Sequence, residues 1–401
     1  MNEAFNGAVI GAKERTRPAN SPGTSRRTCQ VPGQSGGPAR RHLRMTAFLR
    51  FMIAVLLIMA TSFSGCGAAQ QSGKSDGQDD GRIRIVTTIF PPYDFARAIA
   101  GDEAKADITM LLSPGEEIHS YEPTPMDIKK IQNSDLFIYT GGDNDVWVDR
   151  ILENMGDKKP QTLRLVDLTD TVAEEVVEGM MEERGHEHDH GEEHDHEEAD
   201  GHGHSSHVHS GDSSEEEHEE ADEHVWTSPV KAAEITEAIA AKMAEIDPDN
   251  AESYMANAAA YVEEIMKVDA AYREIVDNAE RRTIVFGDRF PLRYFAEEYG
   301  LEYFAAFPGC SSEAEPSAST LAFLIDQVRE EQIPVVFSIE FSNGNIARAI
   351  CESSGAVART FNSCHNVTRE QMEGGETYVS LMTENLDAVR EALGAAKEGA
   401  E

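Results

Sequence analysis

The chain has 401 residues, enough for about two domains of ordinary size, and it carries 73 acidic against 35 basic residues. The formal net charge of -38 argues against nucleic acid as a partner and against charge-driven docking on anionic lipid. Such an acidic chain stays soluble and raises the local concentration of cations, but its charge does not define a fold.

Residues 1–65 are predicted to be a leader with a lipoprotein signal. An apolar stretch from Phe51 to Ala60 follows a basic segment, and small residues then lead to Cys66. The pattern Phe-Ser-Gly-Cys is similar to a bacterial lipobox, which predicts that Cys66 carries lipid. The alternative is a plain transmembrane anchor with an incidental cysteine, although the stretch is short for a span. Residues 66–81 would then form a polar tether.

Residues 82–247 are predicted to form an N-terminal α/β lobe. Strands are expected at 82–89, 106–112, 135–140 and 162–166. Helices are expected at 93–100, 124–133, 146–155 and 229–246, with Pro91-Pro92 breaking the chain before the first of them. Strands that alternate with helices indicate parallel pairing.

A low-complexity, histidine-rich tract at 182–223 interrupts this lobe. It has almost no apolar residue, so it is predicted to be a disordered loop. Imidazoles two residues apart among Asp and Glu form a multidentate ligand for borderline divalent metals. Accessory metal binding is therefore predicted for His186, His188, His190, His194, His196, His202, His204, His207, His209 and His218.

Residues 248–280 predict one long linking helix, because apolar side chains recur at steps of three, four and seven from Tyr254 to Ile275. The α/β alternation then restarts in a C-terminal lobe, residues 281–397. Its strands are expected at 283–286, 302–306, 335–339 and 356–361, and its helices at 291–299, 317–332, 345–353 and 377–396. Two α/β lobes joined by a rigid helix would bind a ligand in the cleft between them.

Two histidines stand where chain segments approach this cleft. His119 follows a predicted strand, and His224 ends the histidine-rich tract. Either one alone could be an ordinary surface histidine. No HExxH motif, nucleophile elbow or phosphate-cradling loop is present, so no enzyme is predicted.

The chain resembles the zinc- and manganese-specific solute-binding lipoproteins of bacterial ABC transporters. The matching segments are LLSPGEEIHSYEPTP, SDLFIYTGGDNDVWVDR, DEHVWTSP, YFAEEYGL, VVFSIEFSNGNIARAICESSGA and GGETYVSLMTENLDAV, within residues 82–396. The resemblance implies two pseudo-symmetric α/β lobes, a long linking helix and one metal ion held in the cleft by four protein ligands. It also implies that the metal passes to a membrane permease served by an ATPase.

Carried over residue by residue, the resemblance assigns His119 and His224 as first-lobe ligands. Relatives place a His or Glu just after the strand 283–286, where this chain has Asp288. Asp288 can supply an oxygen to zinc or can be engaged locally with Arg289. A fourth position, often Asp in relatives, falls on the segment that holds Cys364 and His365.

Cys364 and Glu340 leave alternatives open. Thiolate and imidazole both suit zinc, but Cys364 could instead form a disulfide with Cys310 outside the cytoplasm. Glu340, at the carboxyl end of a strand, is either a metal ligand or a carboxylate that orients a histidine.

The expected function is therefore an extracytoplasmic, lipid-anchored and monomeric receptor for Zn(II). Imidazole and possible sulfur ligands favour zinc over Mn(II), which prefers more carboxylates. The alternatives are a surface metal buffer or adhesin without a transporter, and a zinc-dependent hydrolase with an open coordination position.

Overall fold

The computed structural model describes residues 81–101, 105–118, 121–142, 145–180, 221–309, 311 and 315–396. The predicted leader, the lipidation site Cys66 and the histidine-rich tract up to residue 220 lie outside the described residues, as do His119 and Cys310.

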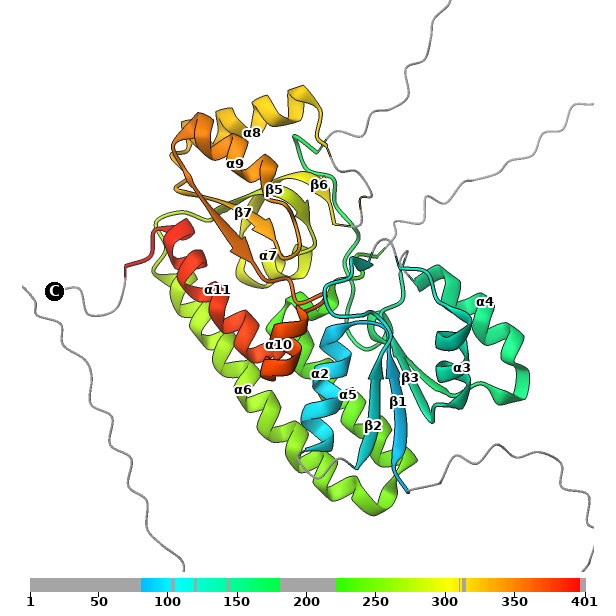
Figure 1. The fold of residues 1–401 in the computed structure, drawn as a ribbon. Coiled ribbons are helices and arrows are strands. Elements are labelled where there is room, and N and C mark those ends of the chain that lie inside the picture. Colours follow the sequence, from blue (N-terminus) through cyan, green and yellow to red (C-terminus); the bar gives the residue numbers. More distant parts are fainter. Residues whose placement is uncertain are drawn as a thin grey trace, which may run out of the picture. The chain divides into compact units, whose positions relative to one another are not determined.

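The first lobe is a parallel four-stranded sheet with the strand order β2-β1-β3-β4 (Figure 1). Alternate residues of β1 and β3 point to two different cores, one under α2 and one under α3 and α4. This sheet is therefore covered on both faces, as parallel sheets require. The strands are β1 (Ile83–Thr87), β2 (Ala106–Met110), β3 (Leu136–Tyr139) and β4 (Gln161–Arg164), and the helices are α2 (Phe90–Ala100), α3 (Pro125–Asn133) and α4 (Val146–Met155).

Helix α2 begins at Phe90, so the predicted break at Pro91-Pro92 is wrong. Proline lacks the backbone N–H, but the N–H groups of the first helical turn have no partner within the helix anyway. The two prolines therefore start this helix instead of interrupting it.

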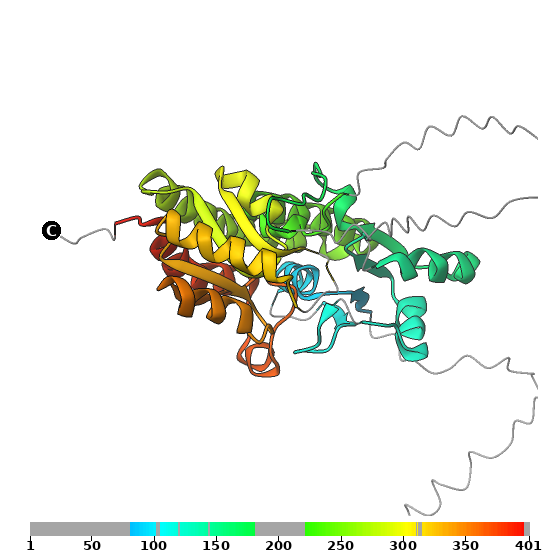
Figure 2. The same ribbon diagram turned by 90° about the horizontal axis from the view of Figure 1, so that it is seen from above.

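The second lobe repeats the topology of the first, with the strand order β6-β5-β7-β8. The predicted pseudo-symmetry of two parallel α/β lobes is thus confirmed. Helices α8 and α9 contact one side of this sheet, and α11 contacts β5, β7 and β8 (Figures 1 and 2). The strands are β5 (Thr283–Phe290), β6 (Glu302–Pro308), β7 (Val335–Ile339) and β8 (Val357–Phe361), and the helices are α7 (Arg293–Tyr299), α8 (Ala318–Glu330), α9 (Asn345–Ser354), α10 (Arg369–Gly374) and α11 (Tyr378–Leu393).

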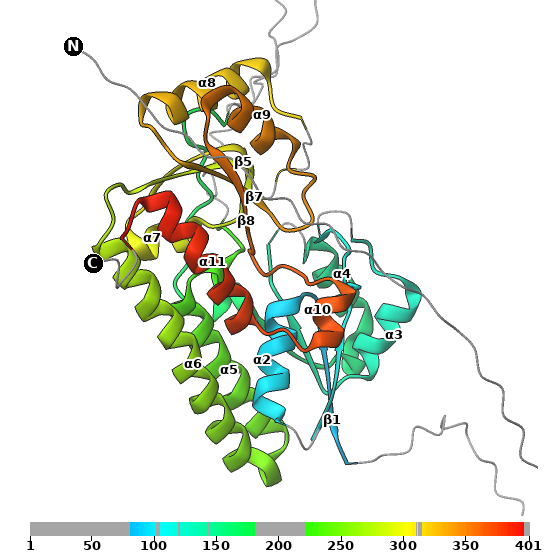
Figure 3. The same cartoon turned by 60° about the vertical axis from the view of Figure 1, so that its left-hand side comes forward.

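A pair of helices connects the lobes. Helix α5 (Pro229–Ile246) leads through a short 3-10 turn into α6 (Ala251–Asp277), whose 27 residues span about 40 Å. Helix α6 packs against α5 and against α2 of the first lobe, and it also packs against α11 of the second (Figure 3). It is the predicted linking helix.

One hydrophobic core passes from lobe to lobe beneath these helices. Its members include Ile85 of β1, Tyr261 and Tyr272 of α6, and Phe286 and Phe361 of the second sheet. Because the same core serves both sheets, the lobes cannot separate widely without exposing apolar surface.

Asp94 of α2 anchors the junction between the lobes, although it is only 1% exposed. Its carboxylate accepts hydrogen bonds from the Tyr261 hydroxyl of α6 and from the backbone N–H of Tyr378, which begins α11. Arg97 forms an ion pair with it at 2.6 Å. Burial raises the pKa of Asp94, against the effect of these donors.

Asp94→Ala should lower the free energy of unfolding by about 3 kcal/mol or more, because it leaves the buried donors of α6 and α11 without their acceptor and removes the ion-pair partner of Arg97. Urea unfolding of the zinc-free protein measures this change. Asp387→Ala is the matched control, since Asp387 also pairs with an arginine but its side chain is 76% exposed. That control should change stability by less than about 0.5 kcal/mol, and an equal loss in both variants would contradict the anchor.

Candidate metal centre

His224 lies at the start of the short 3-10 turn Val225–Thr227 and is fully buried. Asp222 accepts hydrogen bonds from its backbone N–H at 2.8 Å and from its ring Nδ1 at 2.9 Å. A carboxylate can only accept, so Nδ1 carries the proton and the lone pair of the ring lies on Nε2. Among the described residues, no hydrogen-bond partner meets the buried Nε2.

A buried imidazole with this orientation is suited to a cation. Burial by itself would lower the pKa of His224, but the nearby carboxylates of Asp222, Glu223 and Glu174 together raise it. The same negative charge makes Nε2 a more basic ligand.

His365 presents a similar arrangement from the second lobe. Its ring Nδ1 lies 2.6 Å from the hydroxyl of Ser363, and that hydroxyl donates to Glu340 at 2.8 Å. Glu340 also accepts from the backbone N–H groups of Ser363 and His365. Burial raises the pKa of the Glu340 carboxyl against the effect of these donors.

The two histidine rings meet with their centroids 4.8 Å apart. Trp226 packs edge-on against both, at 5.6 Å from the His224 ring and 5.1 Å from the His365 ring. Its indole N–H donates to the carbonyl of Ser363 at 2.9 Å. The element that follows His224 is thus bound to the loop that carries His365.

Gly309, directly after β6, lies against the imidazole ring of His224. A Cβ there would lie 3.0 Å from Cε1 of His224 and 3.1 Å from the carbonyl oxygen of Phe290. Only a glycine leaves room for this close approach of backbone to ring.

The loop that leads to His119 is bound to the residue next to His365. The side-chain amide of Asn366 donates to the carbonyl oxygens of Ser113 at 2.8 Å and Glu116 at 3.0 Å. Ile118 lines one pocket together with His365. His119 itself lies outside the described residues, but both of these contacts bring its loop to the histidine pair.

Asp288 and Cys364 do not join this pair. Asp288 lies inside β5, which runs to Phe290 instead of ending at Phe286 as predicted. Its carboxylate accepts from the backbone N–H groups of Arg289 and Ile339, so it is engaged locally. Cys364 is fully buried in the hydrophobic core, and its thiol forms no disulfide with another described residue. Its predicted partner Cys310 is not described, and that pairing stays a prediction.

Burial raises the pKa of the Cys364 thiol, with the nearby Glu340 carboxylate adding to this effect. Zinc binds the thiolate, so the environment of Cys364 does not favour its role as a ligand. Within the described part of the chain, no three His, Cys, Asp or Glu side chains are grouped closely enough to hold a metal ion. Of the predicted ligands that the structure describes, His224 and His365 are the two whose rings lie against each other.

A segment that precedes the histidine-rich tract is paired with the last residues of the tract, beside His224. Ala173 and Ala221 form an antiparallel bridge, and the N–H of Asp222 donates to the carbonyl of Val172 at 2.9 Å. The hydroxyl of Tyr294 on α7 accepts from the N–H of Val172 and donates to the carbonyl of Asp222. Both paired segments are therefore fixed to the second lobe.

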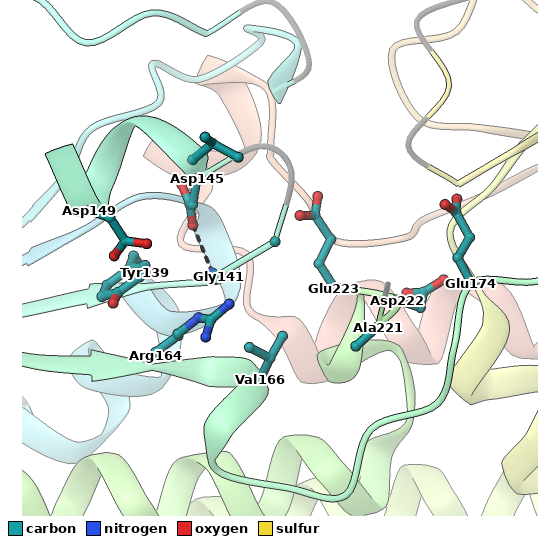
Figure 4. A pocket seen from close by; sticks show the side chains of 12 residues that line it. Tyr139, Gly141, Asp145, Asp149, Arg164, Val166, Glu174, Ala221, Asp222 and Glu223 are labelled. Atoms are coloured by element: carbon teal, nitrogen blue, oxygen red, sulfur yellow. Dashed lines mark hydrogen bonds between the residues drawn. The ribbon is translucent and has the colours of Figure 1, made fainter. Parts of the chain in front are cut away.

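A second, acidic pocket lies next to this bridge. Figure 4 shows Asp145 and Asp149 on one side of it and Glu174 and Glu223 on the other. Asp145 is 5% exposed, and its carboxylate accepts from the N–H groups of Thr140 and Gly141. Burial, with the nearby Glu223 carboxylate, raises the pKa of Asp145 to about 7.

Asp145→Asn should stabilise the protein in a pH-dependent way. The folded protein keeps a proton on Asp145 up to about pH 7, whereas the unfolded chain releases it near its ordinary pKa of 3.8, so stability falls as the pH rises through this window. Asparagine stays neutral, so the variant should gain about 1–4 kcal/mol over wild type at pH 8 and nothing at pH 3.5.

Thermal unfolding at the two pH values measures the gain of this variant. Asp149→Asn is the control, because that carboxyl lines the same pocket but is exposed. A constant difference between Asp145→Asn and wild type at all pH values would contradict the shifted pKa.

Sequence reasoning missed Asp222 and Ser363. Each stands two residues before a histidine, at a distance where an oxygen-bearing side chain can reach Nδ1 of that histidine. In the sequence, the signal for such a partner is an Asp or Ser two residues before a histidine. It is weak without the fold, because short polar residues precede many surface histidines.

Two lobes of the same topology, with a common core and buried histidines between them, define a two-lobed α/β binding protein. The family model described as zinc-uptake complex component A, periplasmic, matches residues 85–392, and the chain belongs to this family. Within the described residues, no helix has both the length and the apolar character needed to cross a bilayer.

Named relatives are similar over most of the chain. The zinc-binding lipoprotein AdcA of Streptococcus pneumoniae is 33% identical over 315 residues, which cover 78% of this chain but only 56% of AdcA. The high-affinity zinc uptake system protein ZnuA of Bacillus subtilis is 31% identical over 343 residues, which cover 86% of this chain and 96% of that protein.

Solved structures agree with the fold. The Zn(II)-bound ZnuA-like domain of Streptococcus pneumoniae AdcA has a TM-score of 0.59 at 29% identity, covering 78% of this chain and 99% of that domain. The metal-dependent lipoprotein YcdH of Bacillus subtilis has a TM-score of 0.60 at 27% identity, with the same coverage of both chains.

Proposed function

We propose that this protein is an extracytoplasmic receptor that captures Zn(II) and delivers it to an ABC-type importer, through a membrane permease served by an ATPase. The observation that carries this proposal is the buried pair His224 and His365, whose Nδ1 atoms are both bound to oxygen acceptors while their rings meet at 4.8 Å. Family membership and the zinc-bound relatives support zinc as the transported ion.

The proposed protein ligands are His119, His224 and His365. Asn366 holds the loop before His119 next to His365, which supports the three-histidine set. Three imidazoles favour zinc over Mn(II), since manganese prefers carboxylate and water oxygens. Asp288, Glu340 and Cys364 are weaker candidates for a fourth ligand, because each is engaged by backbone groups or buried in the core.

The remaining assignments of the sequence belong to the same proposal. Cys66 carries the lipid that holds the protein at the outer face of the membrane, residues 1–65 are the leader, and the mature protein acts as a monomer. Relatives named as lipoproteins support the anchor. The histidine-rich tract gathers zinc weakly, as an accessory to the cleft.

His224→Ala and His365→Ala should each weaken tight zinc binding by more than about 100-fold, since even residues behind the ligands contribute 10- to 100-fold to metal affinity. Competition with a chromophoric chelator measures this loss. His194→Ala, in the tract, is the control and should keep the tight site. Wild-type affinity in both cleft variants would contradict the proposed site.

Replacing residues 182–218 by a short Gly-Ser linker should leave one tight zinc equivalent and remove only weaker ones. The linker must stop before Ala221, because a longer deletion removes Asp222 and with it the partner of His224. Zinc titration in competition with the chromophoric chelator counts the tight and weak equivalents in this variant. Loss of the tight equivalent in the shorter deletion would assign the zinc site to the tract.

Two other functions remain distinguishable by experiment. A surface metal buffer or adhesin would leave zinc-limited growth unchanged when the protein is deleted, whereas a receptor for import would not. A zinc hydrolase would turn over a model ester or peptide, and this turnover would disappear in His224→Ala. We expect impaired growth and no turnover.

A further inference from the structure

Glu340, Ser363 and His365 form a chain of hydrogen bonds behind the proposed zinc site. Glu340 follows β7, while Ser363 and His365 follow β8, the neighbouring strand. The Ser363 hydroxyl is 2.8 Å from Oε1 of Glu340 and 2.6 Å from Nδ1 of His365. Ser363 is only 1% exposed, so water does not compete easily for these contacts.

The single hydrogen of the Ser363 hydroxyl determines which groups donate and which accept in these hydrogen bonds. A serine hydroxyl has one hydrogen, and here it points at a carboxylate, which can only accept. The oxygen of Ser363 must then accept from Nδ1 of His365, so that ring carries its proton on Nδ1. The lone pair of the neutral ring lies on Nε2, the nitrogen that a metal in the cleft would use.

The Glu340 carboxylate already accepts hydrogen bonds from the loop that carries Ser363 and His365. Its Oε2 accepts from the N–H of Ser363 at 2.7 Å, and its Oε1 accepts from the N–H of His365 at 3.1 Å as well as from the Ser363 hydroxyl. Three of the roughly four acceptor positions of a carboxylate are thus used within three residues of chain. A direct bond from Glu340 to zinc would have to break part of this set.

Ser363 also connects the two histidines. Its carbonyl oxygen accepts from the indole N–H of Trp226, and Trp226 is the second residue after His224. The same serine therefore fixes the tautomer of His365 through its hydroxyl and the position of the His224 segment through its carbonyl.

We propose that Glu340 and Ser363 are positioning residues for zinc, which act through His365 and do not bind the metal themselves. This inference rests on the proposed function, because it takes His365 as a ligand. It assigns Glu340 the orienting role and Ser363 the role of the group that transmits it.

The test compares zinc affinity in Ser363→Ala, Ser363→Thr, Glu340→Gln and the double variant Ser363→Ala/Glu340→Gln, all in the full-length mature protein. Ser363→Ala should weaken binding about 10- to 100-fold, and Ser363→Thr, which keeps the hydroxyl, should recover most of this loss. In the Glu340→Gln background, Ser363→Ala should add little, because both changes break the same chain. Ser338→Ala, a buried serine on β7, is the control and should bind like wild type.

A second measurement reads the tautomer directly in the zinc-free wild type. The imidazole 15N resonances that disappear in His365→Ala should show the Nδ1–H form at pH 8, and in Ser363→Ala they should show a mixture. This readout does not depend on the stability of any variant at Glu340. An Nε2–H tautomer in the wild type would overturn the proposal.

The affinity outcomes separate this inference from the proposed function. If His365→Ala binds zinc like wild type, the proposed site itself fails. If His365→Ala loses binding but Ser363→Ala does not, only the positioning role fails. A severe loss in Glu340→Gln beside wild-type affinity in Ser363→Ala would make Glu340 a direct ligand and overturn the inference.

Discussion

A hydrophobic core that passes through both lobes is the constraint on which the rest of this structure depends. Tyr261 and Tyr272 of α6 belong to the same core as Ile85 of the first sheet and Phe361 of the second. Because the core is continuous, the segments that carry His224 and His365 keep a nearly fixed spacing. Changes at the metal site are then expected in loops more than in the angle between the lobes.

Each buried histidine is oriented by an oxygen from a residue two positions earlier in the chain. Asp222 contacts His224 directly, whereas Ser363 stands between His365 and Glu340. The direct partner brings a full negative charge to one ring, and the hydroxyl brings a neutral group to the other. A cation in the cleft would therefore meet two imidazoles of unequal basicity, with the more basic one next to the ends of the histidine-rich tract.

The fold could be predicted largely from periodicity, because parallel α/β lobes impose alternating strands and helices of ordinary length. The errors are local and have physical causes. Prolines at the start of α2 were interpreted as a break, and β5 continues past Phe286 because an irregular register keeps Arg289 and Phe290 paired with β6. At the site, the sequence indicated His224 and His365. It could not indicate how Glu340 is used, since that depends on which backbone N–H groups the fold turns toward its carboxylate.

The bridge between Ala173 and Ala221 allows the histidine-rich tract to change in length and composition. The two flanks of the tract are joined to each other and to Tyr294, so the chain between them begins and ends at a fixed pair of points. Residues can be gained, lost or exchanged between the buried Met180 and Ala221 without moving Asp222 or the histidine that it holds. Selection can thus adjust the metal-gathering composition of the insertion separately from the geometry of the cleft.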